Sequence, residues 1–309
     1  MLSLLKCISR LLWVAGLAAA IIPAGRQSAM ADAFSEDQLQ RIVSVGGDVT
    51  EIIFALGLGD RVVAVDTTSQ YPPDAVKEKK SVGYMRALST EGVLSVAPTL
   101  IVASAEAGPP EVVAALKGST VPFVAVKGEG TPEGVVHKIK AIATALGVAG
   151  EGEKLASRIE AEFAEAAAQK AKVTKPVRAL FVLAQQEGRT VVGGAHTAAG
   201  DMFSLAGAVN AVTGFDGYKP LSDEAAITAA PDVIVVMTRN GGVGADNFAQ
   251  AIGSMRGLAS TPAAKSGRII EVDGSYMLQF GPRAASAALD LMHRFYPELG
   301  PASRETAGK

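Results

Sequence analysis

The chain is almost without cysteine. Its 309 residues include one, Cys7, which lies ahead of an apolar stretch and so does not fit the lipid-modified cysteine of a lipoprotein. We expect Cys7 to leave with a cleaved leader. The chain that remains then has no cysteine, which excludes structural disulfides and cysteine-based catalysis.

The predicted leader is residues 1–31, which have the pattern of a secretory signal peptide. Lys6 and Arg10 supply positive charge, residues 11–22 are apolar, and Ala-Met-Ala at 29–31 is a small-x-small cleavage site. The alternative is a membrane anchor, but the apolar stretch is shorter than the ~20 residues that span a bilayer. We expect cleavage after residue 31 and a periplasmic location in a Gram-negative cell.

Basic clusters and long apolar runs are missing from the rest of the chain. Loss of the leader removes Lys6, Arg10 and Arg26 and no acidic residue, which takes the formal net charge from −2 to −5. Nucleic acid is therefore not expected as a partner. No further apolar run approaches ~18 residues, so the exported chain should be soluble.

Motifs for catalysis are also absent. The sequence has no GxSxG, no Walker A motif and no GxGxxG loop after a strand. His196 and Asp201 are close, but no serine nucleophile is suitably placed, and no tight His/Asp/Glu spacing suggests zinc. His137 and His293 fall in expected helices and are interpreted as structural or exposed. We predict a binding protein, not an enzyme.

What the chain does contain is a regular alternation of short, β-branched runs with helical segments. Near-continuous apolar strands between helices indicate parallel sheets covered on both faces, an α/β architecture. The strands fall into two groups of four, at 41–45, 61–65, 99–104 and 121–126, and at 177–184, 190–194, 232–237 and 268–272.

Between the groups lies a strand-free segment rich in Ala, Glu and Lys, which predicts a helix from about Glu151 to Lys172. We expect a first α/β lobe over 32–148, a connecting helix within 149–175 and a second α/β lobe over 176–309. A single helix would hold the two lobes nearly fixed, unlike a flexible linker. The alternative is one continuous α/β domain in which this helix is an ordinary crossover.

Two facing lobes form a cleft, and "SVGYMRALSTEG" (81–92) lies in a strand-end loop that should line it. In an extended segment Tyr84 and Arg86, two residues apart, point the same way. Ser89 or Thr90 is expected to cap the helix that follows.

The Tyr84 and Arg86 pair suits an iron ligand. A free phenol has a pKa near ~10, but a ferric ion favours its phenolate, which is an axial ligand in some haem proteins. Arg86 either donates a hydrogen bond to the phenolate oxygen or pairs with a carboxylate of the ligand. The alternative is a rim tyrosine beside a solvated arginine.

Residues 41–72 and 82–104 closely resemble the first lobe of periplasmic haem-binding proteins of bacterial haem-uptake ABC transporters, and the second half resembles their second lobe. The stretch "xxTEIxFALGxGD" with "DxxSxYP" is shared with cobalamin- and siderophore-binding relatives, whereas "GYMRxLSxEG" is specific to haem. The resemblance implies a class III periplasmic binding protein fold, with two Rossmann-like lobes joined by one long helix. It also implies ferric haem as the transported ligand.

The resemblance further implies delivery to an inner-membrane ABC permease and its ATPase, with an outer-membrane haem receptor as a possible upstream partner. A siderophore or cobalamin carrier of the same class is the alternative. By the resemblance, Tyr84 is the axial iron ligand, Arg86 lies beside it, and Arg239 in "MTRNGG" turns toward the haem from the second lobe. The alternative for Arg239 is an ordinary turn residue.

The sequence departs from the family at one place. Some members carry a second-lobe histidine in a segment that here reads "LAQQEG", with Gln185 and Gln186. His196 lies in the next loop, before a predicted Thr197 helix cap. It is a candidate ligand, and the alternative is a loop histidine bonded to backbone or water.

Permease docking is expected at one exposed glutamate on each lobe. The candidates by position are Glu111 in "AGPPEVV" and Glu224 in "PLSDEAA", both in the first turn of an expected helix. A first-turn carboxylate is also favoured by the helix dipole, so acids without a partner are the alternative.

Overall fold

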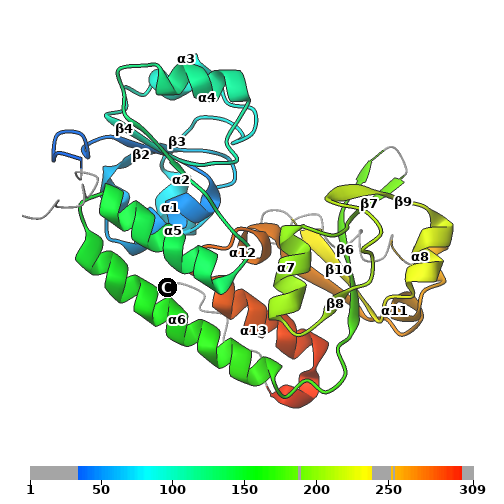
Figure 1. The fold of residues 1–309 in the computed structure, drawn as a ribbon. Helices are drawn as coiled ribbons and strands as arrows, with labels where there is room; N and C mark the ends of the chain where they lie inside the picture. Colours follow the sequence, from blue (N-terminus) through cyan, green and yellow to red (C-terminus); the bar gives the residue numbers. More distant parts are fainter. Residues whose placement is uncertain (1–33, 187–188, 239–251, 253–254, 301–309) are drawn as a thin grey trace, which may run out of the picture. The chain divides into compact units, whose positions relative to one another are not determined.

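A computed structural model describes residues 34–186, 189–238, 252 and 255–300 (Figure 1). Residues 33–309 belong to one compact unit. No helix within the described ranges is both long and apolar enough to cross a membrane.

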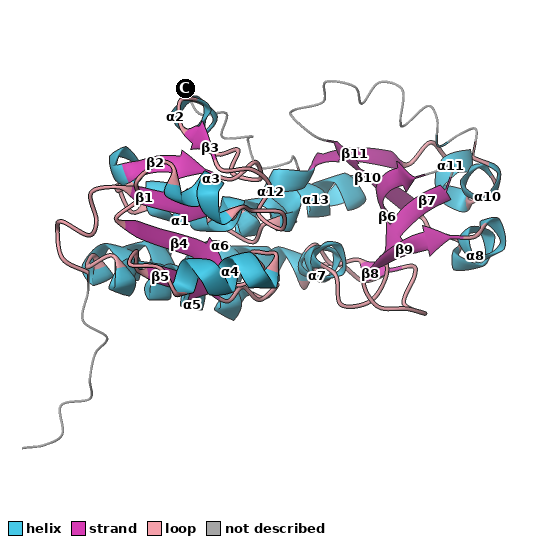
Figure 2. Cartoon of the chain, turned by 90° about the horizontal axis from the view of Figure 1, so that it is seen from above, coloured by secondary structure: helices cyan, strands magenta, loops and turns pink. Residues whose placement is uncertain are grey.

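The first half of the chain forms a five-stranded sheet in which all strands are parallel, in the order β3-β2-β1-β4-β5 (Figure 2). The four predicted strands are confirmed as β1, β2, β4 and β5. The elements are β1 (Ile42–Val45), α1 (Gly47–Ala55), η1 (Gly59–Arg61), β2 (Val62–Val65), α2 (Pro73–Lys77), β3 (Lys80–Ser81), α3 (Thr90–Leu94), β4 (Leu100–Ser104), α4 (Pro110–Lys117), β5 (Phe123–Val126) and α5 (Pro132–Ala145).

Both faces of this sheet are buried, as the unbroken apolar runs predict. Along β4, Leu100 and Val102 pack into one hydrophobic core, whereas Ile101 and Ala103 pack into another on the opposite face. The first core includes α1 and α5, and the second includes residues of α3 and α4.

The second half forms a mixed sheet in the order β11-β10-β6-β7-β9, with β8 also paired to β6. The predicted strands are confirmed as β6, β7, β10 and β11. The elements are β6 (Arg178–Gln186), β7 (Arg189–Gly193), α7 (Ala198–Leu205), β8 (Val209–Asn210), β9 (Tyr218–Leu221), α8 (Asp223–Ala229), β10 (Val233–Thr238), α10 (Arg256–Ala259), α11 (Pro262–Lys265), β11 (Ile269–Asp273), α12 (Gly274–Leu278), α13 (Ala284–Phe295) and η3 (Pro297–Leu299).

The expectation of an all-parallel second sheet is wrong. β7 pairs antiparallel with both β6 and β9. Only residues 187–188 separate β6 from β7, and a two-residue connection can join antiparallel strands but not a parallel crossover. The strands β6, β10 and β11 remain parallel to one another.

One long helix, α6 (Ala149–Lys170), joins the two halves, as predicted. It packs on α5 of the first half and on α13 and α7 of the second, and Figure 1 shows it alongside α5 and α13. Its apolar residues belong to a core that includes the α1 and α5 face of the first sheet and one face of the second. The predicted domain boundaries at 148/149 and 175/176 stay predictions.

A second connection between the halves is polar and buried. Glu51 of α1, 4% exposed, accepts hydrogen bonds from the backbone N–H (2.9 Å) and the Nε (3.0 Å) of Arg283, and Arg283 Nη2 lies 3.0 Å from the same carboxylate. The Arg283 guanidinium stacks on the ring of Tyr71 at 3.7 Å from its centroid and faces Tyr276 at 5.1 Å. Aromatic stacking and a carboxylate together fix this arginine.

Two further contacts surround this pair. Lys138, fully buried in α5, forms an ion pair with Asp48 and donates to the carbonyl of Phe280 at 3.3 Å. Gln279 donates to the carbonyl of Thr68 at 2.7 Å. Gly47 leaves room for Gln279, because a Cβ there would lie 2.2 Å from its Nε2. Residues 279–283 thus contact α1, α5 and the loop that follows β2.

We expect Glu51→Ala to lower the free energy of unfolding by about 3–5 kcal/mol, because it leaves the Arg283 charge unpaired at a buried position. Urea denaturation followed by circular dichroism measures the change. The control is Glu36→Ala, which removes an exposed partner of Arg61 and should change stability by no more than ~1 kcal/mol. Equal small effects of both substitutions would contradict the assignment.

Candidate functional site

The loops at the carboxyl end of the first sheet are organised by one buried carboxylate. Asp66, directly after β2, accepts hydrogen bonds from the backbone N–H groups of Gly46 and Thr68, both at 2.8 Å, and from the hydroxyl of Ser69 at 2.8 Å. These bonds tie the loop after β1 to the loop after β2. They also provide a fixed frame beside the loop that carries Tyr84.

Tyr84 and Arg86 lie together on the loop after β3. The Tyr84 side chain is exposed, with 44% of its surface accessible, and Arg86 Nη1 donates to its hydroxyl at 3.2 Å. The backbone is a turn rather than the extended segment that we expected, because Ala87 N–H donates to the Tyr84 carbonyl at 2.8 Å. The intervening Met85 is buried, so the two flanking side chains share the outer side of the turn.

This loop is held at both ends. Gly108 N–H donates to the Met85 carbonyl, and Leu88 N–H donates to the Gly108 carbonyl, each at 2.9 Å. Ser89 caps α3 by accepting from Gly92 N–H at 3.0 Å, as predicted. The Tyr84 turn and the loop after β4 therefore form one hydrogen-bonded unit.

Glu106, in the loop after β4, was not predicted from the sequence. Its carboxylate forms an ion pair with Arg86 Nη2. Desolvation disfavours the charged guanidinium, but hydrogen bonds to Tyr84 and Glu106 outweigh it and raise the pKa of Arg86. No local sequence signal marked Glu106, because its partner Arg86 lies in a loop twenty residues earlier.

The second half contributes His196 and Asp216. His196 Nδ1 lies 2.8 Å from Asp216 Oδ1, and both side chains are largely exposed. A backbone bridge between Ala195 and Asp216 holds the two loops together. His196 has a φ of 52°, a conformation uncommon for a residue with a side chain. Nδ1 of this histidine is thus paired with a carboxylate, and Nε2 is its other ring nitrogen.

Tyr218, the first residue of β9, was also missed. It is 37% exposed. Partial burial raises the pKa of Tyr218. Hydrogen bonds with Ala199 and Thr197 and the charge of Arg86 lower this pKa, but by less. The dipeptide Gly-Tyr occurs at both Tyr84 and Tyr218, and this repeat is the sequence signal that could have identified Tyr218. In both places the glycine has a positive φ.

The remaining ligand candidates are less well defined. Arg239 lies outside the described residues. Gln185 is exposed at the end of β6 and donates to the sulfur of Met255 at 3.0 Å, and Gln186 belongs to the same strand. In the described ranges, no group of three or more His, Cys, Asp or Glu side chains is arranged to hold a metal ion.

The two predicted docking glutamates are in the first turns of α4 and α8. Glu111 is exposed in α4, and Glu224 is exposed in α8. Hydrogen bonds from its own backbone N–H and from the Ser222 side chain lower the pKa of Glu224, so it carries a negative charge at neutral pH.

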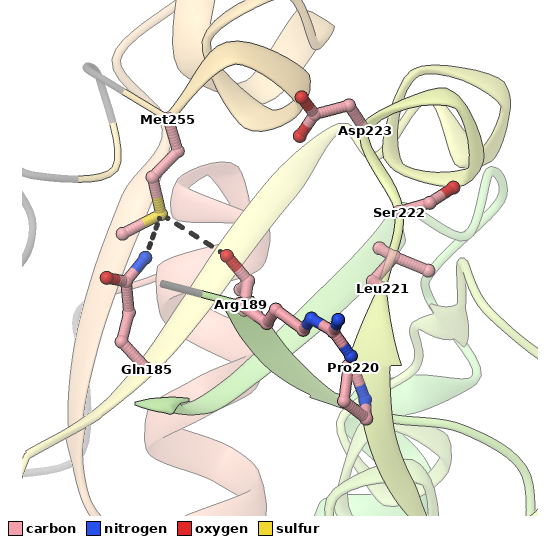
Figure 3. A pocket seen from close by; sticks show the side chains of 8 residues that line it. Gln185, Arg189, Pro220, Leu221, Ser222, Asp223 and Met255 are labelled. Atoms are coloured by element: carbon pink, nitrogen blue, oxygen red, sulfur yellow. Dashed lines mark hydrogen bonds between the residues drawn. The ribbon is translucent and has the colours of Figure 1, made fainter. Parts of the chain in front are cut away.

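A cavity of about 470 Å³ lies on the second half, beside Asp223 at the start of α8 (Figure 3). It does not include the Tyr84 loop, so the interlobe cleft that we expected remains a prediction. Gln185 and Thr190 both donate to the sulfur of Met255 across this cavity. Its lining residues are Gln185, Arg189, Thr190, Pro220, Leu221, Ser222, Asp223 and Met255.

Comparison with known proteins agrees with this fold. The periplasmic heme-binding protein RhuT from Roseiflexus sp. RS-1, in apo form, is 40% identical, with a TM-score of 0.79 over 84% of this chain and 99% of that one. The uncharacterized ABC transporter substrate-binding lipoprotein YvrC of Bacillus subtilis is 27% identical over 84% of this chain and 81% of its own. The vitamin B12-binding protein of Vibrio cholerae is 30% identical over 63% of this chain and 69% of its own length.

The family model described as "periplasmic binding protein" matches residues 42–276. This range begins at β1 and ends within α12, so it contains both sheets and the helix between them. The members and structural neighbours of this family bind solutes and are not enzymes. The chain therefore belongs to the periplasmic binding protein family.

Proposed function

We propose that this chain is the periplasmic substrate-binding protein of an ABC transporter and that its ligand is ferric haem. The similarity to a haem-binding protein at 40% identity and to an ABC transporter lipoprotein supports this assignment. We further propose that residues 1–31 are its cleaved signal peptide and that an outer-membrane haem receptor supplies the ligand.

The observation that carries the proposal is the exposed phenol of Tyr84, with a cationic guanidinium 3.2 Å from its oxygen. On binding ferric iron, the phenol loses its proton to solvent, and its oxygen donates an electron pair to the iron in place of water or hydroxide. The charges of the iron and of Arg86 both stabilise the phenolate. Because the loop is hydrogen-bonded at both ends, the oxygen is held ready for the ligand.

Second-lobe residues complete the proposed site. Arg239 would pair with a haem propionate, since arginine matches carboxylate geometry. His196, whose Nδ1 is paired with Asp216, would border the ligand without binding the iron.

Delivery is proposed to use Glu111 and Glu224 as contacts for arginines of the inner-membrane permease. Both carboxylates are exposed and belong to corresponding helices of the two halves. A negative charge on each half allows the permease to recognise the two lobes together.

A cobalamin or siderophore carrier is the second candidate. The observation that favours it is the vitamin B12-binding relative at 30% identity. This function would make the pairing of Tyr84 with Arg86 incidental.

We expect one equivalent of haemin to give a high-spin ferric, tyrosinate-type absorption spectrum with the mature protein. Tyr84→Phe should abolish the phenolate-to-iron band and weaken binding by more than the ~10–100-fold typical of losing an outer-shell partner. Tyr218→Phe is the matched control, because both phenols are similarly exposed. No spectral response, with tight binding of cobalamin or a ferric siderophore, would refute haem as the ligand.

We expect His196→Ala to leave spin state and affinity almost unchanged, because a single phenolate suffices to hold high-spin ferric haem. Asp216→Asn tests the same histidine through its carboxylate partner. The measurement is haemin titration with electron paramagnetic resonance of the ferric complex. A shared change of spin state in both variants would instead establish His196 as an iron ligand.

We expect Glu111→Lys and Glu224→Lys to leave haem binding intact and to abolish stimulation of the transporter ATPase, measured in proteoliposomes. The matched control is Glu133→Lys, because Glu133 follows a proline in the first turn of α5 just as Glu111 does in α4. Stimulation that survives the double substitution of Glu111 and Glu224 would contradict the docking assignment.

A further inference from the structure

The guanidinium of Arg86 is divided between two acceptors. Nη1 donates to the Tyr84 hydroxyl at 3.2 Å, and Nη2 is paired with the carboxylate of Glu106. Arginine offers its donors in a rigid fork. Because Nη2 is already paired with Glu106, a bidentate pair of Nη1 and Nη2 with a ligand carboxylate would compete with the Glu106 ion pair.

Glu106 is placed by the backbone rather than by chance contact of two long side chains. Its own N–H donates to the Ser104 hydroxyl at 3.2 Å. The loop it belongs to is joined to the Tyr84 turn by reciprocal bonds of Gly108 with Met85 and Leu88. Both ends of the ion pair are therefore carried by one hydrogen-bonded unit.

We infer that Glu106 is a positioning residue, which holds Arg86 on the phenolic oxygen of Tyr84 and withdraws it from the carboxylates of the ligand. The inference rests on the proposed haem-binding function. It resolves the two roles left open for Arg86 in favour of the phenolate.

The electrostatic effect of Glu106 on Arg86 is small, which indicates that Glu106 acts by orienting the arginine. The Arg86 and Glu106 side chains are 55% and 65% exposed, and solvent-exposed ion pairs of this kind contribute little to stability. Glu106 therefore offsets little of the charge that Arg86 presents to Tyr84. The larger effect of Glu106 is on the orientation of the Arg86 side chain, which it keeps turned toward the Tyr84 hydroxyl.

The test is the phenolate-to-iron charge-transfer band and the Fe–O(phenolate) stretching frequency of the ferric haem complex. A hydrogen bond lowers the energy of the phenolate electrons, so its loss moves the band to longer wavelength. We expect Glu106→Gln to move both signals in the same direction as Arg86→Ala, by a smaller amount, and to have no further effect when Arg86 is already alanine. Glu106→Asp should restore part of the shift.

The matched control is Glu129→Gln, because Glu129 forms a similarly exposed ion pair with Lys127 after β5. It should leave the spectra unchanged. Wild-type spectra for Glu106→Gln, or a shift that persists without Arg86, would overturn the inference.

A second measurement asks which group of the ligand Arg86 serves. Arg86→Ala should weaken binding of haem and of its dimethyl ester by the same factor, because the ester lacks the carboxylates but keeps the iron. A loss confined to haem would place Arg86 on the propionates and refute the inference.

Failure of the proposed function is distinguishable. If the wild-type protein gives no phenolate-to-iron band, haem ligation by Tyr84 fails, and the role of Glu106 is then read in the ligand-free protein. There, nitrogen-15 NMR of the arginine side chains should show hindered rotation for Arg86 that is lost in Glu106→Gln. Free rotation in the wild type would refute the positioning role.

Discussion

The buried pair of Glu51 and Arg283 is the contact on which the arrangement of this chain depends most. A charge removed from water is tolerated only when its partners are complete, and here the carboxylate receives three contacts from one residue while the arginine stacks on Tyr71. With Gln279 and the Phe280 carbonyl beside it, this pair docks residues 279–283 on α1, α5 and the loop after β2. The loops after β3 and β4 carry Tyr84, Arg86 and Glu106.

The candidate site follows from this division of the strand ends. Loops after β1 and β2 have a structural role, with Asp66 as their common acceptor. The loops after β3 and β4 carry exposed, chemically active groups on backbone that is nevertheless rigid. The candidate site residues thus lie at the same end of the sheet as the contacts between the two halves but on other segments of the chain.

Much of this was predictable because the signals are local. The apolar runs predicted β1, β4 and β10, and the composition of 149–170 predicted the long helix. The strands β3, β8 and β9 were missed because they are short and largely exposed, so no burial pattern marks them. Lys138 could not be predicted as a buried residue, since its partners Asp48 and Phe280 are 90 and 142 positions away. The role of Glu106 could not be predicted for the same reason, because its partner Arg86 lies in a loop twenty residues earlier.

Two of the four outer strands, β3 of the first sheet and β9 of the second, are poorly suited to pairing with another molecule. An unpaired strand edge is a template for association with another molecule. β3 offers only two residues, one of them Lys80, and β9 carries Lys219 and Pro220, the latter without an N–H to donate. The exposed, charged residues that made these two strands hard to recognise therefore disfavour edge-to-edge association at both of them.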